Sequence, residues 1–339
     1  MSVSPPANVR AGWTGGTAWP VPSDVVQIVH EGAPIPPAAR GSVLSIGMFD
    51  GVHIGHQAVI ARAVATAAGL GTETVVVTFD RHPASVVRPD AGVRLLTDLR
   101  QRADRIGLLG VEVVYVARFD EERSLDDPAV FVDELVRDFA PQAVVVGEDF
   151  HFGHRRRGDL PLLETAGGAA GFKVEGVGAV SLDGIGRVSS TLIREAVAAG
   201  DVALAARLLG RSHAVRGVVE HGDERGRSLG FPTANVAVPG DIQLPADGVY
   251  AGSYLREDGT DHVAAISVGR RPTFYAESGS LLVEAYLLDF DGDLYGEHAE
   301  VAFDTWIRGQ VRFKGVDGLI AQLRSDVEQV REAAEAEGA

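Results

Sequence analysis

Apolar residues follow two different patterns along the chain, and the change falls near residue 210. In the first part, short apolar runs alternate with segments in which apolar residues recur three and four positions apart, the spacing of an amphipathic helix. The strand-length runs cover 42–46, 74–79, 111–116 and 143–146, and the helical segments cover 56–68, 97–109 and 128–139. Continuous valine-rich runs are typical of parallel strands buried on both faces. The pattern predicts a doubly wound α/β domain, completed by a helix over about 191–209 that is interrupted near Gly200.

From residue 213 the apolar runs are short and are separated by Gly, Pro, Asp and Asn. They cover 214–220, 249–254, 263–268, 281–290 and 300–306. Several short strands at this spacing predict an antiparallel β-barrel. The Asp-Gly-Asp sequence at 291–293 predicts a hairpin turn between the last two strands. The Glu-rich segment 316–336 has helical periodicity, and we expect it to pack on the outside of the barrel.

These patterns divide the 339 residues into a flexible lead-in over 1–23, a first domain over 24–210 and a second domain over 211–339. The lead-in contains several Pro and Gly residues but lacks the apolar segment of a signal peptide. No later run approaches the roughly 18 uncharged apolar residues of a membrane helix. We therefore expect a cytoplasmic protein.

Composition excludes several kinds of chemistry. A formal net charge of −16 argues against duplex nucleic acid or an anionic membrane as the main partner, because both require a basic surface. The absence of cysteine excludes a disulfide, a thiolate nucleophile and a zinc–thiolate site. Lys173 and Lys314 are the only lysines, and neither precedes Ser or Thr, which excludes a Walker A loop.

The segment 47–56, Gly-Met-Phe-Asp-Gly-Val-His-Ile-Gly-His, lies where a predicted strand ends and a helix begins. Backbone N–H groups, the helix dipole and two imidazoles at this point would bind a phosphate. The alternatives are two surface histidines in a glycine-rich turn or an incidental metal pair. The candidate residues are Gly47, Phe49, Asp50, Gly51, His53, Gly55 and His56.

Three other segments of the first part are candidates for ligand contact. Arg187, Ser190, Thr191 and Arg194 lead into a helix, where they form either a triphosphate clamp or an ordinary helix cap. The other two segments follow valine-rich strands and should open onto one edge of the sheet, as a ligand rim or as simple turns. Their residues are Asp80, His82 and Pro83 in one segment and Asp149, Phe150 and Phe152 in the other.

The second part contains a dense motif at 226–235, Gly-Arg-Ser-Leu-Gly-Phe-Pro-Thr-Ala-Asn. Thr233 and Asn235 are two residues apart, so an extended segment presents both side chains on one side. Oxygen donors of this kind suit Mg²⁺, whereas the alternative is a turn capped by Asn. Further along, Glu284 alternates with Val283 and Ala285, so its side chain lies on the other face of its strand.

In their order along the chain, these motifs resemble those of the bacterial bifunctional riboflavin kinase/FAD synthetases. The first part is similar to their Rossmann-like HxGH nucleotidyltransferase module. This resemblance implies that His53 and His56 bind ATP phosphates and that Ser190, Thr191 and Arg194 hold the β and γ groups. It also implies that the loops of residues 80–83 and 149–152 line the side of flavin mononucleotide (FMN).

The second part is similar to the riboflavin kinase module, a six-stranded barrel. The resemblance implies that Glu284 is the general base and that Thr233 and Asn235 bind Mg²⁺ and nucleotide phosphate. Gly226, Arg227 and Gly230 are the further candidates for ATP binding in this part, and Arg308 is a candidate for flavin binding.

The implied function is phosphorylation of riboflavin by ATP, followed by adenylyl transfer from ATP to FMN that gives FAD and pyrophosphate. Met48, Arg81 and Asp149 depart from the commonest form of the family pattern. Arg81 and Asp149 favour an alternative, a flavin carrier that has lost a reaction. A third reading is a nucleotidyltransferase for another phosphorylated small molecule, against which the barrel argues. The sequence leaves open whether the chain forms a homo-oligomer.

Overall fold

The computed structural model describes residues 26–222, 229–269 and 281–338. The expected lead-in and the candidates Gly226 and Arg227 lie outside these residues. The described chain forms two compact units. The sheet unit comprises residues 26–95 and 99–189, and the barrel unit comprises 190–338 with 96–98.

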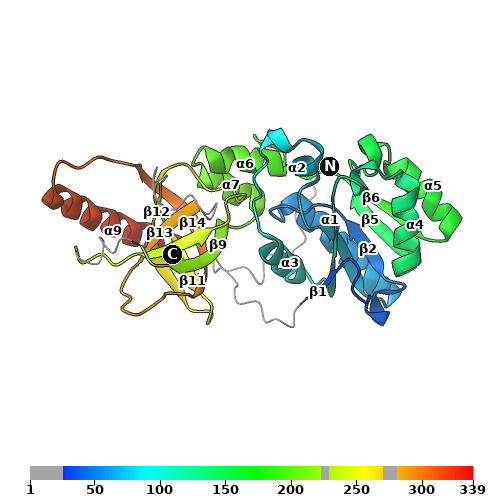
Figure 1. Cartoon of the computed structure of the whole chain (residues 1–339), viewed down its shortest axis with the longest axis horizontal. Helices are drawn as coiled ribbons and strands as arrows, with labels where there is room; N and C mark the ends of the chain where they lie inside the picture. The colour runs from blue at the N-terminus through cyan, green and yellow to red at the C-terminus, as the bar shows by residue number, and fades with distance from the viewer. Residues whose placement is uncertain (1–25, 223–228, 270–280, 339) are drawn as a thin grey trace. The chain divides into compact units, whose positions relative to one another are not determined.

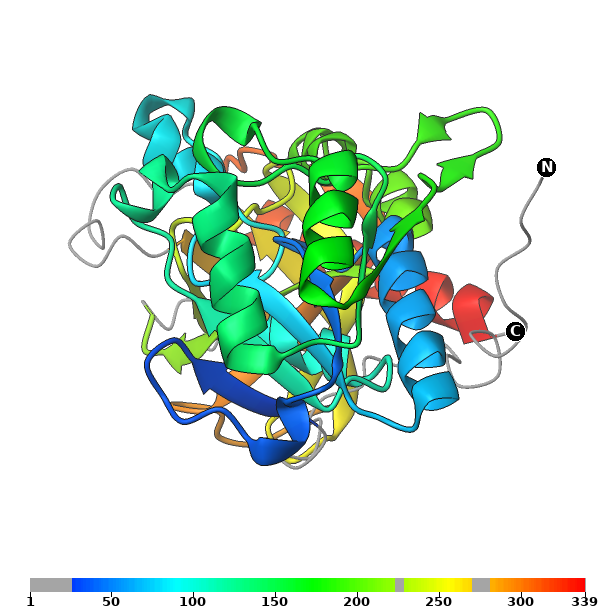
Figure 2. The same cartoon turned by 90° about the vertical axis from the view of Figure 1, so that its right-hand side faces the viewer.

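A parallel six-stranded sheet with the order β1-β4-β3-β2-β5-β6 forms the centre of the sheet unit (Figure 1). Its strands are β1 (Gln27–His30), β2 (Val43–Ile46), β3 (Thr74–Phe79), β4 (Val113–Ala117), β5 (Ala143–Gly147) and β6 (Lys173–Val177). Its helices are α1 (Ile54–Leu70), α2 (Pro83–Val87), α3 (Leu99–Gly107), α4 (Pro128–Phe139) and α5 (Leu160–Ala170). Figure 2 shows the short hairpin of β7 (Ser181–Leu182) and β8 (Gly186–Arg187) extending away from the sheet.

Helices cover both faces of this sheet, and alternate strand residues face opposite layers. Leu44 and Val144 pack with residues of α4, whereas Val76 and Val114 pack with α3 and with Ile60 of α1. Residues with exposures near zero on both faces explain the continuous valine-rich runs in the sequence. The predicted doubly wound α/β architecture is confirmed.

The barrel unit contains a closed antiparallel barrel with the strand order β10-β13-β12-β11-β14-β9. The strands are β9 (His213–Glu220), β10 (Ala234–Val238), β11 (Gly248–Arg256), β12 (Asp261–Val268), β13 (Leu281–Leu287) and β14 (His298–Gly309). Within its described residues, the same unit also contains the helices α6 (Ser190–Ala198), α7 (Val202–Leu209) and α9 (Val316–Gly338). The six-stranded barrel and the final helix are as expected.

The helix α9 packs on the outer face of the barrel. Val330 of α9 is fully buried in a cluster with Ala251 and Leu288. Alternate strand residues point to the other side of the barrel wall. Val283 and Ile266 are of this kind, and they are fully buried in the barrel interior. The amphipathic pattern at 316–336 therefore reflects one covered and one exposed face.

Several predicted details differ from the structure. The hairpin expected at residues 291–293 is wrong, because β13 pairs with β10 and β12 while β14 pairs with β9 and β11. The strand expected over 281–290 ends at Leu287. The break expected in the helix over 191–209 is confirmed at Gly200, where φ is 80°. Both resulting helices, α6 and α7, group with the barrel. No helix in the described chain has the length and apolar character needed to cross a bilayer.

Candidate active sites

The connection from β2 to α1 carries the Gly-x-Phe-Asp-Gly motif in a buried and strained conformation. Phe49 and Val52 have φ values of 50° and 42°, a region that costs residues with side chains roughly 1–3 kcal/mol. Asp50 is only 1 % exposed. A Cβ on Gly47 would lie 3.1 Å from the Phe49 ring, and Gly51 has φ of 80°, so both positions favour glycine. Surrounding contacts must hold this strain, which is typical of functional loops.

The two histidines of the motif lie together at the N-terminus of α1. His53 is the N-cap, and its Nδ1 accepts a hydrogen bond from the backbone N–H of His56 at 3.2 Å. The His56 ring stacks on the His53 ring with a centroid separation of 3.5 Å, and it packs edge-to-face with the Phe49 ring at a centroid distance of 5.3 Å. A Cβ on Gly55 would lie 3.1 Å from the His53 ring. These close contacts fix the orientation of both rings.

The cap also determines which His53 nitrogen can bind a ligand. Because Nδ1 accepts a hydrogen bond, the neutral ring carries its proton on Nε2. The Nε2–H group is therefore the ring's donor, at the positive end of a 17-residue helix. This chemistry suits an anionic oxygen, as in a phosphate.

The segment after β3 is held by a hydrogen bond from a distant loop and by another within the segment. Asp80 Oδ1 accepts from the backbone N–H of Phe119 at 2.9 Å, and Arg81 Nε lies 3.7 Å from Asp80 Oδ2. His82 is the N-cap of α2, whose backbone donates to its Nδ1, and Pro83 occupies the first turn. Asp80 thus joins the loop after β3 to the loop after β4, and His82 fixes the start of α2.

The segment after β5 combines a charged pair with two stacked rings. Asp149 forms an ion pair with Arg187 of β8, so its charge is compensated. Phe150 stacks on Phe152 with a centroid distance of 5.3 Å. Phe152 is only 8 % exposed and packs against Phe131 in the core. Phe152 therefore supports Phe150 from the core, and Phe150 is the more accessible ring.

Ser190, Thr191 and Arg194 lie in the first turns of α6. Thr191 is exposed, and Ser190 and Arg194 are half-buried. These residues belong to the barrel unit, whereas His53 and His56 belong to the sheet unit. The structure thus describes the two halves of the predicted ATP site separately.

A cavity of about 420 Å³ in the barrel unit brings together four residues singled out from the sequence. The predicted residues in its wall are Thr233, Asn235, Glu284 and Arg308. Several aromatic side chains line the rest of the cavity. A cavity of this size that combines aromatic walls with convergent polar side chains is typical of a small-molecule site.

Strand register explains why Glu284 and Asn235 meet. Asn235 of β10 lies opposite Glu284 of β13, which in turn lies opposite Ser267 of β12. Residues in such a row project from the same face of a sheet. Their neighbours Val283 and Val236 are fully buried in the interior, so the row lies on the outer face that α9 covers. The alternation expected around Glu284 is confirmed.

Arg308 is bound to α9 by a residue that the sequence analysis did not identify. Arg308 Nε and Nη2 donate to Asp326 at 2.7 and 2.6 Å, and Gln322 donates to the same carboxylate at 2.9 Å. Asp326 is 3 % exposed and also lines the cavity. The sequence did contain a signal for Asp326, because it is a charged residue on the helix face that carries apolar Val330. Arg308 lies in β14 and Asp326 in α9, so the pair links the strand to the helix.

The donors in the cavity fit a magnesium ion better than a transition metal. Thr233 and Asn235 offer a hydroxyl and an amide oxygen, and Mg²⁺ commonly takes one or two protein oxygens and completes its shell with phosphates and water. Within the described ranges, no cluster of three or more His, Cys, Asp or Glu residues could hold a metal ion. A Cβ on Gly222 would lie 2.2 Å from the Asn235 amide, so the glycine lets the chain pass close to it.

Comparisons with known proteins cover both units. The FAD synthetase family model matches residues 35–192, and the riboflavin kinase model matches residues 209–334. A bifunctional riboflavin kinase/FMN adenylyltransferase from Listeria monocytogenes is 39% identical over 291 residues, which are 85% of this chain and 91% of the relative. A protein of the same name from Pseudomonas fluorescens is 41% identical and aligns over 87% of this chain and 94% of its own length.

Among solved structures, a protein from Streptococcus pneumoniae described as a macrolide-efflux protein has the same fold. Its TM-score is 0.79 at 30% identity, with 90% of this chain and 98% of that one covered. Both halves of the chain thus match known modules in the same order as in the relatives. The chain belongs to the family of bifunctional riboflavin kinase/FMN adenylyltransferases.

Proposed function

We propose that the barrel cavity phosphorylates riboflavin and that the site at the start of α1 adenylylates the resulting FMN. In the first reaction, the 5′-hydroxyl of the ribityl chain attacks the γ-phosphorus of ATP, and ADP leaves. In the second, a phosphate oxygen of FMN attacks the α-phosphorus of ATP, and pyrophosphate leaves. The observation that carries the proposal is the convergence of Glu284, Thr233 and Asn235 on one cavity.

Glu284 is the proposed general base of the kinase reaction. An alcohol is a poor nucleophile, so a carboxylate that accepts its proton as the bond forms increases the rate by about 10² to 10⁴. Asn235, a proposed ligand of Mg²⁺ and the ATP phosphates, lies directly opposite Glu284 and therefore beside the base. Mg²⁺, when bound by Thr233 and Asn235, would neutralise charge on the phosphate oxygens. Gly230 and the residues Gly226 and Arg227 are proposed to contact ATP.

The second reaction requires positioning more than proton transfer. The phosphate of FMN is already an anionic nucleophile at neutral pH, so the site must align it and neutralise the leaving pyrophosphate. His53 Nε2, His56 and the N-terminus of α1 are proposed to bind the ATP phosphates. Their fixed rings are the supporting geometry. Arg187, Ser190, Thr191 and Arg194 are proposed as further phosphate ligands.

The FMN side of this site is proposed to be the carboxyl edge of the sheet. The loop of Asp80, His82 and Pro83 follows β3, and the loop of Asp149 and Phe150 follows β5. Open α/β sheets bind ligands at this edge. Because Asp149 pairs with Arg187, its charge no longer favours the reading as a flavin carrier.

We propose that the protein acts on small-molecule substrates in the cytoplasm, and the net charge of the chain supports the class of substrate. The net charge of −16 disfavours polyanionic partners such as nucleic acid or an anionic membrane surface. We propose that ATP, riboflavin and FMN are the partners. The proposed domain limits, 24–210 and 211–339, assign one reaction to each part.

A time course with purified protein tests the function. The protein is incubated with riboflavin, ATP and Mg²⁺, and the flavins are resolved by chromatography. We expect FMN to appear first and FAD to follow. Stoichiometric binding of unchanged riboflavin, without an ATP-dependent product, would instead support a carrier.

A further inference from the structure

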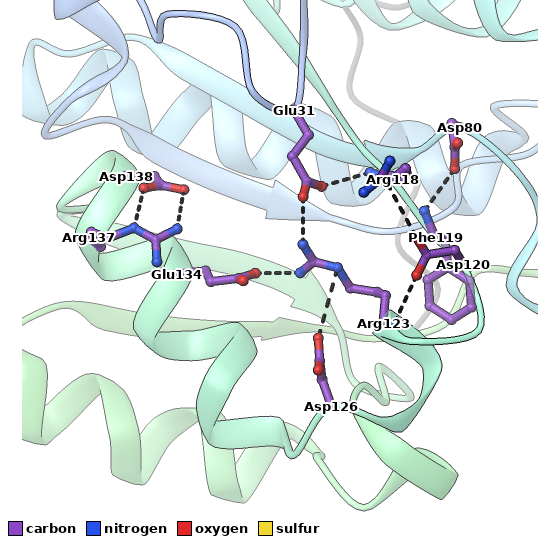
Figure 3. A network of polar contacts seen from close by, with 10 residues as sticks. All are labelled: Glu31, Asp80, Arg118, Phe119, Asp120, Arg123, Asp126, Glu134, Arg137 and Asp138. Atoms are coloured by element: carbon purple, nitrogen blue, oxygen red, sulfur yellow. Dashed lines mark hydrogen bonds and ion pairs between the residues drawn. The ribbon is translucent and has the colours of Figure 1, made fainter.

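The connection from β4 to α4, residues 118–127, contains a hydrogen-bonded network around Arg123 (Figure 3). The Arg123 side chain is 14% exposed. Its Nη2 donates to Glu31, which follows β1, at 2.9 Å, and its Nη1 donates to Glu134 of α4. Its Nε lies 3.9 Å from Asp126. One guanidinium therefore joins the end of β1, the helix α4 and its own loop.

The same network reaches the Asp80 loop. The second oxygen of Glu31 accepts from the backbone N–H of Arg118 at 2.8 Å, and the next residue, Phe119, donates its N–H to Asp80 at 2.9 Å. The Phe119 ring also packs edge-on against Phe79 with a centroid distance of 5.6 Å. Glu31 thus links Arg123 to the backbone that holds Asp80.

The other end of the connection holds the loop after β5. The backbone N–H of His154 donates to the carbonyl of Asp126 at 2.7 Å, and its Nδ1 lies 3.1 Å from the carbonyl oxygen of Ser124. Arg157 donates to Asp127 at 2.9 Å. Both loops proposed to bind FMN are therefore fastened to the segment that Arg123 anchors.

We propose that Arg123 is a positioning residue for adenylyl transfer, which fixes the β4–α4 connection and so orients the loops of Asp80 and Phe150 toward FMN. This inference rests on the proposed function of those loops. Arginine suits the task because its planar fork binds two carboxylates at once, which a lysine cannot reproduce. Removing the central member of this partly buried polar network leaves its partners unsatisfied and free to move.

A second cavity, of about 280 Å³, makes a chemical rescue practicable. Arg123 lines it together with Glu31, Glu134 and Tyr115. Truncation of Arg123 to alanine would enlarge this space beside two carboxylates. Guanidinium ion at a low, non-denaturing concentration could then occupy the position of the lost side chain.

The test compares Arg123→Ala with wild type in the full chain. We expect the KM for FMN in FAD formation to rise by about tenfold or more, the scale that misplacing a reacting group produces. The KM for ATP and the turnover of riboflavin phosphorylation should not change. Guanidinium should lower the KM for FMN again, and Arg123→Lys should fall between wild type and Arg123→Ala. Arg137→Ala is the control, because Arg137 lines the same cavity but its side chain pairs with the adjacent Asp138.

Other outcomes would overturn the inference. Equal increases in KM for FMN and ATP, no change in either, or a rescue of thermal stability without a rescue of KM would each show that Arg123 does not orient the FMN side. If Arg123→Ala does not fold, the same comparison of KM values is made with Arg123→Lys. Failure of the wild-type protein to convert FMN to FAD would refute the proposed function instead.

Discussion

At the scale of single residues, the kinase assignment depends on Glu284. Its carboxylate lines the cavity with Thr233 and Asn235, on the outer face of the barrel. We expect Glu284→Gln to lower riboflavin phosphorylation by about 10²- to 10⁴-fold, because the amide cannot accept the hydroxyl proton. FAD formation from supplied FMN should continue at the wild-type rate. Both rates are measured by chromatography of the flavins.

The control for this variant is Glu257→Gln. Glu257 is an exposed residue of the same unit and does not line the cavity. It should leave both activities unchanged. Loss of both activities in a folded Glu284→Gln protein would contradict the separation of the two sites.

The histidine pair gives the reciprocal prediction. His53 both caps α1 and presents Nε2–H, and serine can replace only the first role. We expect His53→Ser to be more stable than His53→Ala by about 1 kcal/mol, because serine keeps the cap while both variants lose the packing of the ring. Both variants should lose most FAD formation and retain riboflavin phosphorylation. Full adenylylation by His53→Ser would show that capping alone explains this residue.

The residues predicted for the kinase site lie together in the structure, while their roles stay predictions. Thr233 and Asn235 could be selected from their side-chain types and spacing, Glu284 was selected through the family resemblance, and all three line one cavity. The burial of Phe152 and the pairing of Arg308 with Asp326 depend on tertiary contacts. The sequence offered only a weak signal for Asp326, its place on the helix face that carries Val330, and none for its partner.

At the scale of elements, α9 closes one wall of the barrel cavity and is held by the pair of Arg308 and Asp326. We expect Asp326→Asn to lower the free energy of unfolding by about 2 kcal/mol. This is less than the roughly 3–5 kcal/mol for a fully buried pair, because the Arg308 side chain remains 18% exposed. Urea denaturation followed by tryptophan fluorescence measures the change, since Trp306 lies in β14. Glu332→Gln, an exposed change on the same helix, should have little effect.

The start of the barrel contains a pH-dependent contact. Burial raises the pKa of Asp304 in β14, although the hydrogen bond from the Ser212 hydroxyl opposes this shift. A raised pKa in the folded state means that the carboxyl group favours folding at low pH and loses this contribution as the pH rises through that pKa. We therefore expect Asp304→Asn to gain stability relative to wild type as the pH increases above the usual range of aspartate. Unfolding free energies measured from pH 4 to 8 test this, and a constant difference would contradict it.

Element boundaries illustrate what sequence patterns resolve. The strand β3 and the helix α4 agree residue by residue with the predicted ranges, because β3 is a continuous apolar run and α4 combines helical periodicity with a clear start at Pro128. The short β10 was not predicted as a strand, since its first two residues belong to a motif that was interpreted as chemistry and only three residues of the strand follow it. The supposed hairpin at 291–293 failed because turn residues do not reveal which strands become neighbours in a closed barrel.

At the scale of the whole molecule, each of the two compact units matches one enzymatic module of the family. The product of one reaction is the substrate of the other, and each proposed site has its own key residues. The change in hydrophobic pattern near residue 210 predicted the two fold types. It could not reveal that α6 and α7 group with the barrel, because a helix has the same periodicity in either unit.

Two defective variants test this division most directly when they are mixed. Glu284→Gln retains only FAD formation and His53→Ser combined with His56→Ala retains only riboflavin phosphorylation, so neither should convert riboflavin to FAD alone. The mixture with ATP and Mg²⁺ should produce FAD, because FMN released by one protein is a substrate for the other. Absence of FAD from the mixture, with both proteins folded and active on their own substrates, would contradict free passage of FMN. Formation of FAD from riboflavin by either variant alone would contradict the assignment of one reaction to each site.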